Sequence, residues 1–407
     1  MTVSRWCVLI VVLTAVSAQP CRAQALSTAD ADTRTQYPPL LANGYFGLGV
    51  GAIDVPFTAS QLQPGYQAFA IRTPHPAFQI TLLGRQFNRY FSGEMNYTRP
   101  VRWARYDNVN NSGANDSVWV VLGEFKLRAR VPIGDRVFVY GDAGVAVTSR
   151  HGARTADGAV VVQDAHYPAL LTGAGVEYRV NDRWSLLGGF TRAAASRTHN
   201  QPRALLFSSG IRYHLHPLPA DRVADALRGG FIFPKQILLV GYAASLAGYG
   251  PNHFFSKTVP IFWGGNLSVD HGFTVRYERN LFHTTSRFAF DLGASGARWH
   301  APKSSEHLAS VSLYPLLRFF LIRTRSADLH VYYSLAGPTI LSRADLNGVP
   351  LGTNRFSFQD LMGVSVLAGR TRNVLIGVGL GHYSNGNLFP INAGVAIPLA
   401  ISLGYAF

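Results

Sequence analysis

The stretch that decides the fold is Val374-Leu-Ile-Gly-Val-Gly-Leu-Gly-His-Tyr-Ser384, near the end of the chain. Alternate residues of this stretch fall on two contrasting faces. One face carries Val374, Ile376, Val378 and Leu380, and the other carries Leu375, Gly377, Gly379, Gly381 and Tyr383. Such alternation is typical of a β-strand with one apolar side. His382 and Ser384 continue the apolar face, so an imidazole and a hydroxyl stand among apolar neighbours.

Alternating segments of the same kind recur along the whole chain, separated by short polar turns and longer polar loops. The predicted strands cover 44–53, 77–86, 89–106, 117–131, 136–150, 167–180, 183–197, 203–215, 235–248, 257–282, 285–299, 307–322, 327–340, 356–369, 373–385 and 394–407. Short turns at one end and long loops at the other are typical of a transmembrane β-barrel.

The composition favours the same class of protein. Hydrophobic residues make up 47% of the chain and charged residues 14%, with 40 Gly and 18 Tyr. After the N-terminus, no apolar run approaches the roughly 18 residues that a membrane-spanning helix needs. A chain this apolar, rich in glycine and aromatic residues, is more typical of a membrane β-barrel than of a soluble domain.

A proline- and charge-bearing stretch without strand alternation, 217–233, divides the predicted strands into two groups. We therefore predict an all-β fold of two tandem eight-stranded antiparallel barrels, over 44–216 and 234–407, joined by a linker with one helical turn. The alternative is a single sixteen-stranded barrel, which would keep its strands tightly connected through the middle. Abundant small inward residues in the second half favour two small, filled barrels.

The N-terminus has the features of a secretory signal peptide, predicted over 1–23. An apolar run from Trp6 to Val16 follows Arg5, and Cys21-Arg-Ala23 is an acceptable cleavage site. Both cysteines, Cys7 and Cys21, lie within this segment, so a mature chain has no cysteine-based metal or redox site.

No cofactor is expected either. Several histidines lack metal-ligand spacing with one another; they are His253, His283, His300, His307 and His330.

The predicted location is the bacterial outer membrane.

The formal net charge is +15, which raises the question of an anionic partner. The basic residues are scattered through turns and strands rather than gathered in a stripe, so nucleic acid is not the expected partner. The lipid phosphates of an outer-membrane surface fit better. Loop charge that serves solubility is an equal alternative.

The end of the chain carries a possible catalytic group. His382 and Ser384 project from one strand face, so the imidazole can serve as general base for the hydroxyl. Asn385, Asn387 and Asn392 lie in the loop that follows, where amide and backbone N–H groups can stabilise an oxyanion. Because the pair lies on the apolar face, a substrate is expected to reach it from the membrane.

The motif His382-Tyr-Ser-Asn-Gly386, followed by Asn392-Ala-Gly394 and one closing strand, resembles the lipid A deacylase (PagL-like) family of acyloxyacyl hydrolases. The resemblance covers about 231–407, whereas 44–216 more generally resembles outer-membrane barrels of the OmpA type. It implies an outer-membrane hydrolase that removes an ester-linked acyl chain from the lipid A of lipopolysaccharide. Ser384 would be the nucleophile, His382 the base, and the loop asparagines the oxyanion and substrate contacts.

The chain departs from this family at the carboxylate that orients the histidine, because the corresponding residue is Ala396. Asp360 is a candidate replacement, since it shares the apolar face of the preceding strand. A hairpin centred on Thr371 places it opposite His382, and opposed Cβ atoms are about 4.5–5.5 Å apart. A serine–histidine dyad is another possibility. Two further alternatives for the whole protein are a catalytically inactive structural barrel and a pore.

The last predicted strand also suggests a partner. It ends at Phe407, and its alternation predicts that Val395, Ile397, Leu399, Ile401, Leu403, Tyr405 and Phe407 face outward and that Ala396, Ala400, Ser402, Gly404 and Ala406 face inward. This pattern looks like the signal read by the outer-membrane assembly machinery.

Overall fold

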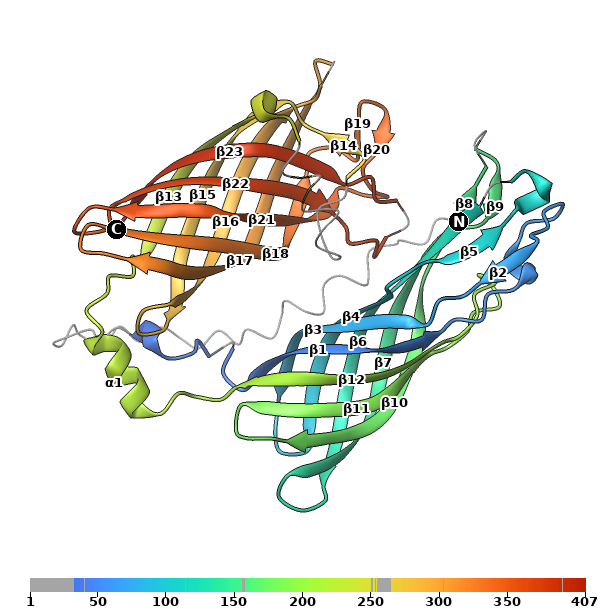
Figure 1. The fold of residues 1–407 in the computed structure, drawn as a ribbon, viewed down its shortest axis with the longest axis horizontal. Helices are drawn as coiled ribbons and strands as arrows, with labels where there is room; N and C mark the ends of the chain where they lie inside the picture. The colour runs from blue at the N-terminus through green and yellow to red at the C-terminus, as the bar shows by residue number, and fades with distance from the viewer. Residues whose placement is uncertain are drawn as a thin grey trace, which may run out of the picture. The chain divides into compact units, whose positions relative to one another are not determined.

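Two antiparallel β-barrels make up most of the structure, a computed structural model (Figure 1). It describes residues 33–39, 41–113, 115–155, 158–249, 252, 254, 265–302, 304–389 and 391–407. The predicted signal peptide, 1–23, and part of the predicted strand 257–282 lie outside these residues. Among the residues described, no helix combines the length and apolar character needed to span a membrane.

Eight strands close the first barrel. They are β1 (Gly44–Asp54), β3 (Pro76–Gln86), β4 (Phe91–Pro100), β6 (Asn115–Pro132), β7 (Val137–His151), β10 (Ala165–Arg179), β11 (Trp184–Ala193) and β12 (Ala204–Leu215). Each is antiparallel to the next along the chain, and β12 pairs with β1 to complete the wall.

Short elements decorate the loops of this barrel. They are η1 (Thr33–Thr35), η2 (Ala59–Gln61), β2 (Ala70–Arg72), β5 (Ala104–Asp107), η3 (Val109–Asn111), β8 (Ala153–Arg154) and β9 (Val160–Val162). The predicted strand 89–106 is therefore two strands, because β4 ends at Pro100, whose ring removes a ladder N–H group.

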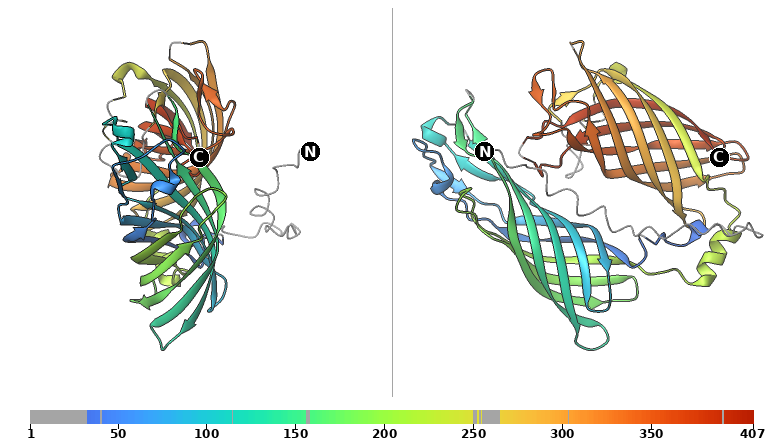
Figure 2. Two further views of the ribbon diagram at one scale, coloured as in Figure 1. Left: turned by 90° about the vertical axis from the view of Figure 1, so that its right-hand side faces the viewer. Right: turned by 180° about the vertical axis from the view of Figure 1, so that it is seen from behind.

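Eight further strands close the second barrel. They are β13 (Gln236–Ala244), β15 (His271–His283), β16 (Phe288–His300), β17 (His307–Arg323), β18 (Ala327–Leu341), β21 (Phe356–Ala368), β22 (Val374–Ser384) and β23 (Val395–Ala406). Closure comes from the pairing of β13 with β23. The right-hand view of Figure 2 shows these yellow-to-red strands following one another around the wall. The prediction of two eight-stranded barrels is confirmed.

The remaining elements lie outside the two walls. They are α1 (Ala220–Arg228), η4 (Ser245–Ala247), β14 (Leu267–Ser268), β19 (Asp345–Leu346) and β20 (Val349–Pro350). Helix α1 falls in the segment predicted as a linker and is longer than the single turn expected there. In the second barrel, brief turns such as 284–287 and 369–373 lie at one end, and longer connections such as 342–355 lie at the other, the loop end.

The outer walls expose apolar side chains in a continuous alternation. Examples are Leu48, Val50, Leu127, Phe207 and Ile211 in the first barrel, and Leu238, Val240, Val275, Val311, Leu313, Ile401 and Leu403 in the second. In water this surface would be unfavourable, but it is the surface that a barrel in a lipid bilayer presents.

The lumen of the first barrel is filled by paired charges. Arg128 donates two hydrogen bonds to Asp142, at 2.8 and 2.9 Å, and lies 3.1 Å from Glu94. The Lys126 ammonium lies 3.0 Å from Asp142. A cavity lined in part by Glu94, Lys126 and Arg128 measures about 40 Å³, room for only a few water molecules.

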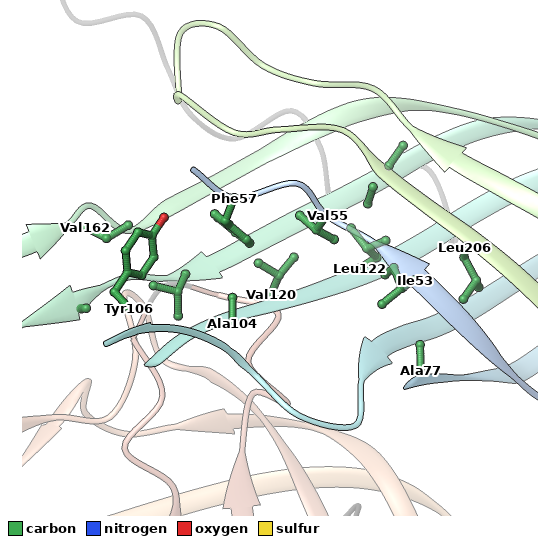
Figure 3. Packing of buried hydrophobic residues seen from close by; sticks show 14 of the residues in the cluster. Ile53, Val55, Phe57, Ala77, Ala104, Tyr106, Val120, Leu122, Val162 and Leu206 are labelled. Carbon is green, nitrogen blue, oxygen red and sulfur yellow. The ribbon is translucent and has the colours of Figure 1, made fainter. Parts of the chain in front are cut away.

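An apolar cluster fills the loop end of the same barrel (Figure 3). Phe57 and Tyr106 come from the loops, and Ile53, Val120 and Leu206 come from the strands below them. Burial of such side chains stabilises the fold by roughly 1.5–3 kcal/mol each. This end of the barrel is therefore closed by packing and the middle by ion pairs.

The second barrel repeats this plan in its middle. Arg318 contacts Glu278 and Asp291, and its guanidinium lies 2.7 Å from His330 Nε2. All of these side chains are buried. Buried charges persist only when they are paired, so Arg318 is a central support of this lumen.

The prediction for the faces of β23 is wrong in its first part. Val395 and Ile397 were expected to face outward and Ala396 inward, but Val395 and Ile397 belong to the buried core with Tyr383. The register slips between Gly379 and Gly381, so two residues of β23 oppose one residue of β22. Pro398 falls in this bulge, where its missing N–H is tolerated. One extra residue reverses the two faces beyond it.

Candidate active site

Strand β22 carries both His382 and Ser384 and ends at the serine. Lower on the same face, Ile376 is 52% exposed and Val378 is 43% exposed. His382 is only 3% exposed, so the apolar face does not stay open to the membrane up to the imidazole. The two-residue period of the sequence correctly predicted that His382 lies on the apolar face of the strand. It did not predict that the imidazole is buried there.

His382, on β22, has a cross-strand partner on each of the two neighbouring strands. Asp360 of β21 is its direct partner on one side, and Ala396 of β23 is its partner on the other. The position that holds a carboxylate in the resembled family is thus beside the imidazole and is occupied here by a methyl group. Asp360 offers the carboxylate from the opposite side.

The Asp360 carboxylate approaches the imidazole closely. Its Oδ2 lies 3.6 Å from His382 Nδ1, and both side chains are largely buried. Its Oδ1 accepts a hydrogen bond of 2.7 Å from the backbone N–H of Ala336. The carboxylate is therefore fixed on one oxygen and faces the histidine with the other.

A bulge in β18 supplies that Ala336 N–H group. The register with β21 shifts between Ser334 and Gly337, and Ala336 has a left-handed φ of 53°. A non-glycine residue in this region costs roughly 1–2 kcal/mol. Bulges and backbone strain of this kind are frequent next to functional sites.

The Ser384 hydroxyl lies next to a second backbone donor. Gly386 N–H donates to Ser384 Oγ at 3.0 Å. General-base catalysis needs a further contact between Oγ and the second ring nitrogen of His382. The two residues share a strand face, so their side chains project from the same side of the sheet. Catalytic hydrogen bonds are often long before substrate binds.

The loop asparagines mostly hold the loop itself. Asn392 Oδ1 accepts from Asn385 N–H at 3.0 Å, and Asn392 Nδ2 donates to Asn387 Oδ1 at 2.8 Å. Asn385 Nδ2 donates to Ile391 O at 2.6 Å. Asn385 and Asn392 thus fix the shape of the turn, and Gly386 N–H is a donor placed at the serine.

Tyr383 anchors the other side of the strand inside the barrel. Its hydroxyl contacts Ser310 Oγ at 2.7 Å and accepts a hydrogen bond from Trp299 Nε1 at 3.1 Å. Gln359 donates to it at 3.4 Å. These buried bonds fix β22 at the level of His382 and so limit the movement of the imidazole and the serine.

Sequence reasoning missed three of these groups, namely the Ala336 N–H, the Gly386 N–H and the Tyr383 hydroxyl. No residue type marks a backbone donor, although Gly386, with φ of 63°, is a turn signal in the sequence. The arrangement brings together a hydroxyl, an imidazole, a carboxylate and a backbone N–H donor, the kinds of group that acyl transfer requires.

Comparison with known proteins gives one family match. The family model for the outer membrane protein beta-barrel domain matches residues 8–214, half of the chain. No curated protein matches the sequence.

Several solved structures are similar to one barrel's length of the chain. The outer membrane enzyme PagL is 17% identical over 42% of this chain and 98% of its own, with a TM-score of 0.30. Neisserial surface protein A is 13% identical over 42% and 97%, with a TM-score of 0.28. The N-terminal β-barrel of Pseudomonas aeruginosa OprF is 11% identical over 42% and 98%, with a TM-score of 0.27.

Proposed function

The chain belongs to the outer membrane protein beta-barrel domain family, whose model matches residues 8–214, and we propose that the second barrel, which follows this match, is a serine esterase. The proposed reaction removes an ester-linked acyl chain from lipid A in the bacterial outer membrane. The observation that carries the proposal is the placement of Asp360 opposite His382, with Ser384 two residues further on the same face.

The first chemical step is attack by Ser384 Oγ on the ester carbonyl. His382 takes the hydroxyl proton on Nε2, and Asp360 faces Nδ1 and stabilises the imidazolium. The carbonyl oxygen gains negative charge as the tetrahedral intermediate forms. Gly386 N–H lies beside Oγ and can turn to this oxyanion, assisted by the Asn387 amide.

Collapse of the intermediate breaks the ester bond. The imidazolium gives its proton to the departing sugar or hydroxyacyl oxygen, and the acyl group remains on Ser384. Water, deprotonated by His382, then attacks the acyl-serine; the bond from the acyl carbon to Ser384 Oγ breaks, His382 returns the proton to Oγ, and the fatty acid leaves. Every proton moves through His382, so loss of its ring removes both halves of the reaction.

The surroundings of Ser384 support a lipid substrate. Phe358 is the direct cross-strand partner of the serine, and Val364 and Val378 continue the outward face towards the turn end. An acyl chain lying along this wall would contact only apolar side chains. Its ester group would then lie at the level where β22 ends, at the membrane boundary.

Mass spectrometry of lipid A from cells that express the protein tests this function. Cells with the wild type should lose one acyl chain from lipid A, whereas cells with Ser384→Ala should keep it. Ser365→Ala is a matched control, because Ser365 lies in the same hairpin on the buried face. Identical lipid A from wild-type and Ser384→Ala cells, at equal outer-membrane levels, would refute the proposal.

A further inference from the structure

Three neighbouring strands of the second barrel bring histidines together at the loop end. His271 at the start of β15 pairs with His300 at the end of β16, and His300 pairs with His307 at the start of β17. All three follow the outward face of their strands. The sequence predicted no metal-ligand spacing among its histidines, because the strand register and not the spacing joins these residues.

A carboxylate completes the group. Asp270 directly precedes β15, and its Oδ2 lies 3.1 Å from His271 Nδ1. Ligand atoms of Asp270, His271 and His300 all lie within 4.8 Å of one another. We propose that these three residues bind one divalent transition-metal ion of the Zn²⁺ class.

The chemistry of the ligands selects this class of ion. Imidazole nitrogen suits Zn²⁺ and Cu²⁺, whereas Mg²⁺ and Ca²⁺ prefer oxygen ligands. Bonds of about 2.0–2.2 Å from nitrogen and oxygen to zinc place neighbouring ligand atoms roughly 3.3–3.5 Å apart. The Asp270–His271 separation of 3.1 Å is close to this range, and the proposed site requires the His300 side chain to rotate to bring in the third ligand.

The environment of the ligands is also suitable. The Ser245 hydroxyl donates to Asp270 Oδ1 at 2.6 Å, which fixes the carboxylate and leaves Oδ2 towards the histidines. Such outer partners orient metal ligands in known sites. Among the residues that the structure describes, His300 Nδ1 is a buried atom without a hydrogen-bond partner. Coordination would satisfy this nitrogen.

Access and a further ligand are available. The side chains of His271 and Asp270 are 43% and 47% exposed, so an ion can enter from water. The His271 and His300 rings are stacked with centroids 4.8 Å apart, so the rings have to turn out of this stacking for their nitrogens to meet on one ion. His307 is exposed, and its ring centroid lies 5.1 Å from that of His300, so it can supply a fourth ligand.

Equilibrium dialysis with Zn²⁺ tests the site on the tag-free, chelator-treated full chain in detergent. The wild type should bind one ion at this site, and His271→Ala with His300→Ala should weaken binding at least tenfold. His151→Ala is the matched control, because His151 faces Asp164 at 3.4 Å without the stacked imidazole and cross-strand histidine ladder of this site. Its affinity should equal that of the wild type.

A second measurement does not depend on the folding of a variant. Cu²⁺ bound to the wild type should show magnetic coupling to at least two imidazole nitrogens by electron paramagnetic resonance. Absence of this coupling, or equal Zn²⁺ affinity in the wild type and the folded double variant, would overturn the proposal. Ser384→Ala should leave Zn²⁺ binding unchanged, so the metal site and the esterase can fail separately.

Discussion

At the scale of single residues, the central feature is the histidine between an aspartate and an alanine. His382 has two direct cross-strand partners, Asp360 on β21 and Ala396 on β23. A carboxylate on either side can face the ring. An alanine at one neighbouring position is therefore compatible with an Asp–His–Ser arrangement, provided that the other position supplies the carboxylate.

Asp360→Asn tests whether the carboxylate that faces His382 comes from β21. It should lower the rate of deacylation by about 10²–10⁴-fold, because the amide cannot stabilise the imidazolium. Ala396→Glu in the same protein should recover at least tenfold of the loss. Asp345→Asn is the control, since Asp345 is a half-exposed carboxylate of the same barrel that pairs with Arg343. Full activity in Asp360→Asn would show that the carboxylate has no catalytic role.

At the scale of elements, most of the fold follows from the two-residue period of the sequence. The predicted strand over 373–385 corresponds to β22, and that over 356–369 to β21. The hairpin between them is regular, so simple register arithmetic gives the same partner for Asp360 that the structure shows. Strand alternation and turn signals are local properties, and the sequence contains them.

The bulges could not be predicted in this way. Neither the slip at Pro398, which turns Ala396 towards His382, nor the slip at Ala336 changes the local pattern of apolar residues. Each register slip depends on how two strands pair with each other. The burial of His382 and the cross-strand pairing of the histidines of β15, β16 and β17 likewise depend on contacts between distant segments.

Ala336→Gly tests the role of the β18 bulge. Glycine adopts a positive φ without steric cost and keeps the N–H that holds Asp360, so the variant should keep full activity. Glycine relieves the backbone strain but loses more entropy on folding than alanine does. The net effect should raise the free energy of unfolding by up to about 1 kcal/mol. Ala294→Gly, on β16, should instead lower it by roughly 0.5–1 kcal/mol. Urea unfolding in micelles measures both, and equal losses would contradict the bulge argument.

At the scale of the whole molecule, each barrel combines an apolar wall with a charged, paired lumen. Both lumens place arginines between carboxylates, Arg128 in the first barrel and Arg318 in the second. Filled lumens of this kind favour two compact membrane domains over a water-filled pore. The site proposed for catalysis lies on the wall and does not need an open lumen.

Arg318→Met tests the contribution of the charged lumen to stability. It leaves Glu278 and Asp291 buried beside each other without their main partner, so the free energy of unfolding should fall by about 3–5 kcal/mol. Adding Glu278→Gln and Asp291→Asn should return a substantial part of the loss, because the unpaired charges are removed. A loss below about 1 kcal/mol in Arg318→Met would contradict the network's proposed role.

The central claim is that His382 activates Ser384 as a nucleophile, and covalent labelling tests it most directly. The folded protein in detergent is treated with a long-chain alkyl fluorophosphonate, and the modified peptide is identified by mass spectrometry. We predict an adduct on Ser384 in the wild type, none in His382→Ala and slower labelling in Asp360→Asn. An unmodified Ser384 in the folded wild type, or equal labelling in His382→Ala, would contradict the account.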